Sequence, residues 1–94
     1  MSCGDLLVFL LADLGEPNAS DARKQWLGLQ LKAAMQFIER EGISLSVPLT
    51  YEDGALIVMY AAYLVRKRDT SEGMPRMLRW ALNNRLFSQK AQED

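Results

Sequence analysis

Residues 51–68 read YEDGALIVMYAAYLVRKR, and this stretch decides the fold class. From Ala55 to Val65 no charged or amide side chain interrupts the run. A helix that is apolar on all sides is covered by other protein on several sides. The run has only about half the length that a membrane span needs. We therefore predict a central helix buried inside a small protein.

Both ends of this segment carry helix signals. Thr50 can cap the amino end, and Asp53 resembles the second member of a capping box, with Asp in place of Glu. The basic triplet Arg66, Lys67 and Arg68 lies at the carboxyl end, where the helix dipole favours cations. The dipole alone can explain the triplet, and an interaction surface is the other explanation.

Three further segments, residues 5–14, 20–41 and 75–89, place apolar residues at helical spacing. Gly15 and Gly42 follow the first two and are suitable stop signals. In the last segment, one set of residues is expected to face inward: Met74, Met77, Leu78, Ala81, Leu82 and Leu86.

The start signals agree with these bounds. Asn18 or Ser20 can cap the second segment, and Pro75 suits the first position of the last one. Residues 91–94 are expected to be loose. The sequence therefore predicts one all-α domain over residues 1–94, a compact bundle of about four helices.

The stretch 43–49 alternates apolar and polar residues, a pattern that also fits a short strand. No other segment offers a partner strand, and an isolated strand is unstable. We predict an extended connector, with Ile43, Leu45 and Val47 packed on the core.

Charge is unevenly distributed along the chain. Residues 1–65 hold four Lys/Arg and eight Asp/Glu (net −4), whereas residues 66–90 hold seven and two (net +5). The basic part can meet DNA phosphates, a partner, or the acidic part of a neighbouring copy, or it can be a solvated surface. Because Trp and Arg are enriched at protein interfaces, we select as candidate interface residues Arg66, Lys67, Arg68, Arg76, Arg79, Trp80 and Arg85.

The residue types argue against catalysis. The chain has no histidine and one cysteine, so it cannot build a Ser–His or Cys–His nucleophile pair or an intrachain disulfide. The six glycines are scattered and form no phosphate-binding loop. We predict no enzyme activity, catalytic residue, metal, cofactor or small-molecule substrate, and no membrane insertion.

A helix-turn-helix DNA-binding regulator is an alternative, with the 75–89 helix presenting Arg76, Arg79, Asn83 and Asn84 to bases. The connection between the last two helices is longer than the usual turn of three or four residues. The slightly acidic overall charge also argues against it. A monomeric adaptor that binds one foreign protein is a third possibility.

Two strings, YAAYLVRKR (residues 60–68) and MPRMLRWALNNRLF (residues 74–87), resemble the small head–tail connector proteins of tailed bacteriophages and prophages. The segment 51–90 carries most of the resemblance. The FIEREG string at residues 37–42, at the end of a long helix, is similar to that family more loosely.

The resemblance implies a head-completion protein without catalytic activity. Such proteins form a homo-oligomeric ring between the portal protein and a tail-side neck protein, and double-stranded DNA passes through it non-specifically. The protein is then expected at the head–tail junction of the virion, after synthesis in the bacterial host cytoplasm.

Overall fold

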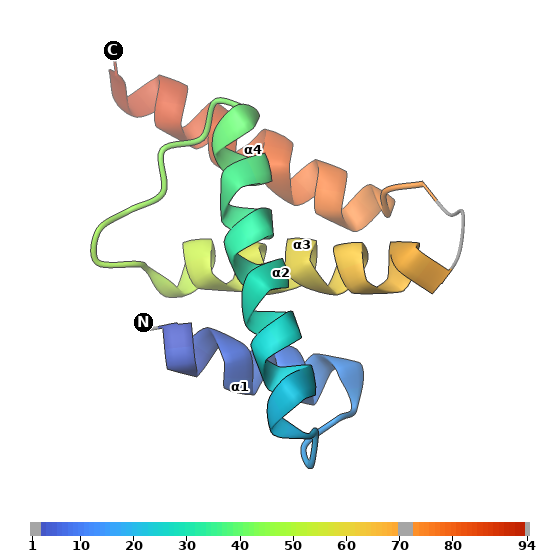
Figure 1. Ribbon diagram of the computed structural model, residues 1–94. Coiled ribbons are helices and arrows are strands. Elements are labelled where there is room, and N and C mark those ends of the chain that lie inside the picture. The colour runs from blue at the N-terminus through green and yellow to red at the C-terminus, as the bar shows by residue number, and fades with distance from the viewer. Residues whose placement is uncertain (1–2, 70–72, 94) are drawn as a thin grey trace.

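The computed structural model describes residues 3–69 and 73–93, which form four helices (Figure 1). They are α1 (Cys3–Leu14), α2 (Asp21–Arg40), α3 (Tyr51–Asp69) and α4 (Arg76–Glu93). The described residues include no strand, and the all-α prediction is confirmed. None of the described helices combines the length and the hydropathy that crossing a membrane requires.

The expected start and stop signals operate at α1 and α2. Ser20 caps α2, because its hydroxyl accepts a hydrogen bond from the Arg23 backbone N–H at 3.2 Å. Gly15 follows α1 with φ +71°, and Gly42 follows α2 with φ +96°. Such positive φ values favour glycine, and they turn the chain away from each helix axis.

The start of α3 differs in detail from a capping box. The Thr50 hydroxyl accepts a hydrogen bond from the Asp53 N–H at 3.2 Å, as predicted. The Thr50 N–H donates to the Ser46 hydroxyl at 3.0 Å, so the Asp53 carboxylate does not close the box. Aspartate is one methylene shorter than the glutamate of a capping box, and here its carboxylate binds other partners.

Helices α1, α3 and α4 lie side by side in one layer with α3 in the middle, and α2 crosses one face of that layer (Figure 1). The extents are 46 × 31 × 18 Å. Packed helices lie about 8–10 Å apart, so the short dimension corresponds to two helical layers. The other face of the layer has no helix over it among the described residues.

The core lies between α2 and this layer. The middle of α3 is buried on most of its circumference, which confirms it as the central helix. The fully or almost fully buried core side chains include Leu6, Leu10, Leu27, Leu31, Ala34, Ile38, Ile57, Ala61, Leu78 and Leu82.

Three sequence expectations differ from the structure. Met77 was expected to face inward but is 67% exposed, because Leu78 and Leu82 take the positions that face the core. The connector buries Ile43 and partly buries Leu45, whereas Val47 is 96% exposed. Helix α4 also extends to Glu93, so most of the residues expected to be loose continue the helix.

Candidate functional site

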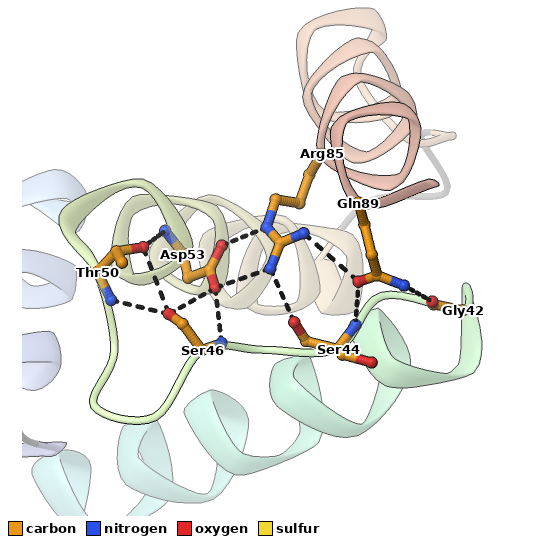
Figure 2. Close-up of polar contacts among 7 residues, drawn as sticks. All are labelled: Gly42, Ser44, Ser46, Thr50, Asp53, Arg85 and Gln89. Atoms are coloured by element: carbon orange, nitrogen blue, oxygen red, sulfur yellow. Dashed lines mark hydrogen bonds and ion pairs between the residues drawn. The ribbon is translucent and has the colours of Figure 1, made fainter. Parts of the chain in front are cut away.

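A buried ion pair joins α4 to α3 (Figure 2). The Arg85 Nε donates to Asp53 Oδ1 at 2.7 Å, and its Nη2 donates to Asp53 Oδ2 at 3.2 Å. The Asp53 side chain is 1% exposed and the Arg85 side chain is 16% exposed. Two parallel hydrogen bonds of this kind fix the orientation of both side chains.

The connector between α2 and α3 is tied to the same pair. The Ser46 N–H and hydroxyl each donate to Asp53 Oδ2 at 2.8 Å. Arg85 Nη2 also donates to the Ser44 carbonyl at 2.7 Å. A single Arg–Asp pair therefore holds α3, α4 and the connector together.

Gln89 lies one helical turn after Arg85 and extends the network. Its side-chain amide donates to the Gly42 carbonyl at 2.9 Å, and its oxygen accepts from the Ser44 N–H at 2.6 Å. Figure 2 shows these bonds running along the connector. These bonds attach the carboxyl-terminal half of α4 to the connector between α2 and α3.

The network keeps its charges at neutral pH. Burial raises the pKa of Asp53, but hydrogen bonds from Arg85 and Ser46 outweigh it, so the pKa is lowered overall. The hydrogen bond to Asp53 raises the pKa of Arg85. This arrangement gives Arg85 a structural task inside the monomer, and the sequence alone placed it only as a candidate interface residue.

The basic triplet at the end of α3 is divided among different neighbours. Arg66 forms an ion pair with Asp13 of α1, with 3.1 Å between Nη2 and Oδ2. Arg68 stacks over the Trp26 ring at 5.1 Å from the ring centroid, beside α2. Lys67 lies 5.7 Å from the centroid of the Tyr63 ring. Arg66 and Lys67 line one hollow together, whereas Arg68 turns toward α2, so the triplet does not form a single patch.

Two other predicted residues lie on α4 near its start. Arg79 forms an ion pair with Glu41, with 2.6 Å between Nη1 and Oε1, and this hydrogen bond raises the pKa of Arg79. Arg76 is exposed, and within the described part of the chain its guanidinium has neither an ion pair nor a hydrogen bond. Arg76 is thus the candidate cation with the most freedom to meet another molecule.

The outward side of α4 forms a stripe that we call the α4 edge: Arg76, Trp80, Asn83 and Phe87. The spacing of three to four residues places all four on one side of the helix. Trp80 is 62% exposed and Phe87 is 77% exposed. A cation and two large aromatic rings therefore face outward together, away from the buried Leu78 and Leu82.

The outward side of α1 forms a second stripe, the α1 edge: Asp5, Val8, Phe9 and Ala12. Val8 is 62% exposed and Phe9 is 49% exposed. The helix carries two aspartates and no Lys or Arg. The sequence did not predict this edge, because the helical spacing in residues 5–14 is that of the leucines, and Val8 and Phe9 are not among them.

A shallow apolar groove lies between α1 and α3. Its volume is about 380 Å³, and it is lined by Phe9, Tyr51, Gly54, Ala55, Val58 and Met59. Tyr51, Ala55 and Met59 recur every four residues along the exposed side of α3. A second hollow of about 270 Å³, whose lining includes Met59 and Met77, lies where α3 meets α4.

No family model, curated protein or solved structure matches the chain. Within residues 3–69 and 73–93, no three Asp, Glu or Cys side chains gather closely enough to hold a metal ion. The fold and its surface define a small all-α protein with exposed apolar residues on two edges. None of these comparisons tests the resemblance to head–tail connectors, which stays a hypothesis.

Proposed function

We propose that this protein is a structural subunit that assembles with copies of itself, as a head–tail connector of a tailed bacteriophage or prophage. In this role it forms a ring between the portal protein and a tail-side neck protein. Double-stranded DNA passes through the ring without sequence-specific contact. The protein acts at the head–tail junction of the virion after synthesis in the host cytoplasm.

One observation carries the proposal: exposed apolar side chains line two different edges of a flat layer, and the charges of those edges are opposite. A ring requires two unlike, complementary surfaces on every subunit. The α4 edge supplies Arg76 beside Trp80, and the α1 edge supplies Asp5 beside Val8. The resemblance of residues 51–90 to the connector family supports the same proposal.

The helix-turn-helix alternative has weaker support. Arg76, Asn83 and Asn84 are exposed on α4 and can reach another molecule. However, six residues separate α3 from α4, and α4 runs back along α3 in the opposite sense (Figure 1). A helix-turn-helix has a shorter turn and a crossing of about 90–120°. A DNA regulator is therefore retained only as an outcome of the test below.

The test measures assembly directly. We expect native mass spectrometry and analytical ultracentrifugation to detect oligomers whose population rises with protein concentration. Electron microscopy of the chain mixed with the portal protein encoded beside it is expected to show closed rings on the portal. A gene that lies between capsid and tail genes is the matching genomic expectation.

Trp80→Asp tests whether the exposed aromatic residue takes part. Trp80 is 62% exposed, so the variant is expected to keep its helical circular dichroism and lose the oligomers. Leu29→Asp is the matched control, because Leu29 is 60% exposed on the outer side of α2, and it is expected to assemble normally.

Three results contradict the proposal. A chain that stays monomeric at every concentration, with and without the portal protein, removes the assembly function. Sequence-specific DNA binding with a steep salt dependence supports the DNA-binding regulator in place of the assembly function. A monomer that binds one foreign host protein replaces it with an adaptor.

A further inference from the structure

We propose that the α4 edge of one copy binds the α1 edge of the next copy, with Trp80 seated in the groove between α1 and α3. This inference rests on the proposed self-assembly and names the two surfaces that perform it. The occupant of the apolar groove is thus a second copy of the same chain.

The order of the helices makes this contact repeat. Helices α1 and α4 lie on opposite sides of α3 in the layer, so the two edges belong to opposite sides of the molecule (Figure 1). A contact between two unlike surfaces of identical subunits is heterologous. Each copy then binds two neighbours, and the chain of contacts closes into a ring when the rotation between neighbours permits.

Charge complementarity selects the partner surface. Helix α1 carries Asp5 and Asp13 without a cation of its own, although Arg66 of α3 already pairs with Asp13, whereas α4 carries three arginines and Lys90 against one glutamate. Intramolecular pairs engage Arg79 and Arg85, which leaves the Arg76 guanidinium available beside Trp80. Opposite charges across an interface steer association and exclude α4–α4 and α1–α1 pairings.

The apolar parts of the two edges also match. The α4 edge projects Trp80 and Phe87, and the α1 edge offers Val8 and the groove that Phe9 borders. Interface energy concentrates in aromatic and Arg anchors that fill desolvated pockets. Trp80 lies one helical turn from Arg76, so the anchor and the charge can engage the same site.

The size of the contact indicates weak pairwise binding. Helix α4 has 18 residues and is about 27 Å long, and the molecule is 18 Å thick, so one edge covers about 490 Å². A standard stable interface buries about 800 Å² per partner. A single contact of this size is therefore weak, and ring closure or a portal template supplies the remaining stability through multivalency.

Chemical cross-linking distinguishes this arrangement from others. In a Cys3→Ser background, the double variant Ala12→Cys/Asn83→Cys carries one thiol on each edge and leaves the proposed anchors intact. A short bismaleimide reagent is expected to yield a ladder of dimers, trimers and larger species. Each single-cysteine variant is expected to stay uncoupled. Lys32→Cys/Asn83→Cys, with one thiol on the outer side of α2, is the control and is expected to give no ladder.

Charge reversal provides an independent readout. Arg76→Glu and Asp5→Arg are each expected to weaken association by about tenfold, since each places like charges in contact. The double variant Arg76→Glu/Asp5→Arg restores opposite charges across the contact and is expected to recover most of the assembly. Sedimentation at several concentrations measures all three variants.

The outcomes separate the inference from the proposed function. If the wild-type chain forms rings but the double-cysteine variant gives no ladder and the charge swap gives no recovery, the edges are wrong and the function stands. Dimers from one single-cysteine variant indicate a symmetric contact and overturn the inference. A wild-type chain that never assembles overturns both.

Discussion

Replacing Arg85 by methionine is expected to lower the free energy of unfolding by about 3 kcal/mol. The substitution removes both hydrogen bonds to the Asp53 carboxylate and the one to the Ser44 carbonyl. Methionine keeps most of the aliphatic length of arginine, so the packing of the side-chain stem changes little. The predicted loss therefore measures the polar network.

The magnitude follows from what remains around Asp53. Its side chain is 1% exposed, so water cannot replace the lost guanidinium without local opening. Removing one partner of a buried ion pair costs about 3–5 kcal/mol. Asp53 keeps two hydrogen bonds from Ser46, which places the expected cost at the lower end of that range.

Thermal unfolding followed by circular dichroism is a suitable assay at a concentration where the chain is monomeric. A domain of this size loses about 4–8 °C in Tm for each kcal/mol, so a decrease of about 12–24 °C is expected. Arg79→Met is the matched control on the same helix. Its ion pair with Glu41 is 45% and 31% exposed, and such pairs contribute about 0–1 kcal/mol.

The pH dependence of stability provides a second, independent test of the Asp53–Arg85 pair. Burial raises the pKa of Asp53, but hydrogen bonds from Arg85 and Ser46 leave it lowered in the folded protein. The stabilisation is therefore fully present above the unfolded pKa of about 3.9 and is lost as pH falls through the folded pKa. Loss of Arg85 leaves burial as the stronger influence and raises the pKa of Asp53 in the variant above its wild-type position, so the variant takes up the proton first as pH falls. The stability difference between wild type and Arg85→Met is therefore expected to shrink as pH decreases.

The reasoning is refuted if Arg85→Met loses no more stability than Arg79→Met. It is also refuted if the difference from wild type stays constant down to pH 2, since protonation of Asp53 must remove the need for a cation. The double variant Asp53→Asn/Arg85→Met completes a cycle, in which a coupling energy near zero contradicts the buried pair.

Other substitutions test the local structure by the same unfolding assay. Gly42→Ala is expected to cost about 1–2 kcal/mol because φ is +96°, while the added methyl meets Leu86 at an ordinary 3.6 Å. Gly28→Ala, inside α2 with open space at the new methyl, is expected to gain about 0.5–1 kcal/mol, and a loss contradicts that helix. Ser20→Ala removes the cap of α2 and is expected to cost about 1 kcal/mol, whereas Ser20→Gly costs only a few tenths. Ile57→Ala opens a cavity at a fully buried position and is expected to cost about 2–5 kcal/mol, with an unchanged Tm as the contradicting result.

The helices were predictable because their signals are local. The apolar run 55–65 requires protein on several sides, and it became the central helix. Gly15, Gly42 and Ser20 act on the backbone within a few residues of their own positions. Local rules of this kind do not depend on how the helices later pack.

The polar network was not predictable because its partners are distant in the sequence. Asp53 and Arg85 are 32 residues apart, and only the packing of α4 on α3 brings them together. The sequence pointed to a cap for Asp53 and to an interface for Arg85. The same network explains Val47, because Ser46 turns toward Asp53 and Thr50, and the connector then leaves the core.

The α1 edge was missed for a different reason. The charge count treated residues 1–65 as one segment, so the cations of α2 were summed with the aspartates of α1. The sum did not reveal that α1 itself has no Lys or Arg. Met77 was assigned to the core by its helical spacing from Met74 and Ala81, although it precedes the buried Leu78 and therefore lies about 100° away on the helix. The angular position of a residue around the helix axis, and not its apolar character alone, decides whether it faces the core.

The surface that folding leaves uncovered is the strongest physical reason to expect a partner. Scattered exposed apolar residues are ordinary, but Trp80 and Phe87 share one side of α4 with Arg76, and Val8 and Phe9 share the acidic side of α1. Folding of the monomer requires none of these side chains to be apolar, because each points away from the core. A weak contact between such edges favours assembly on a template, since a strong one would close rings before the template is met. The weakness estimated for one edge is therefore an expected property of a connector subunit.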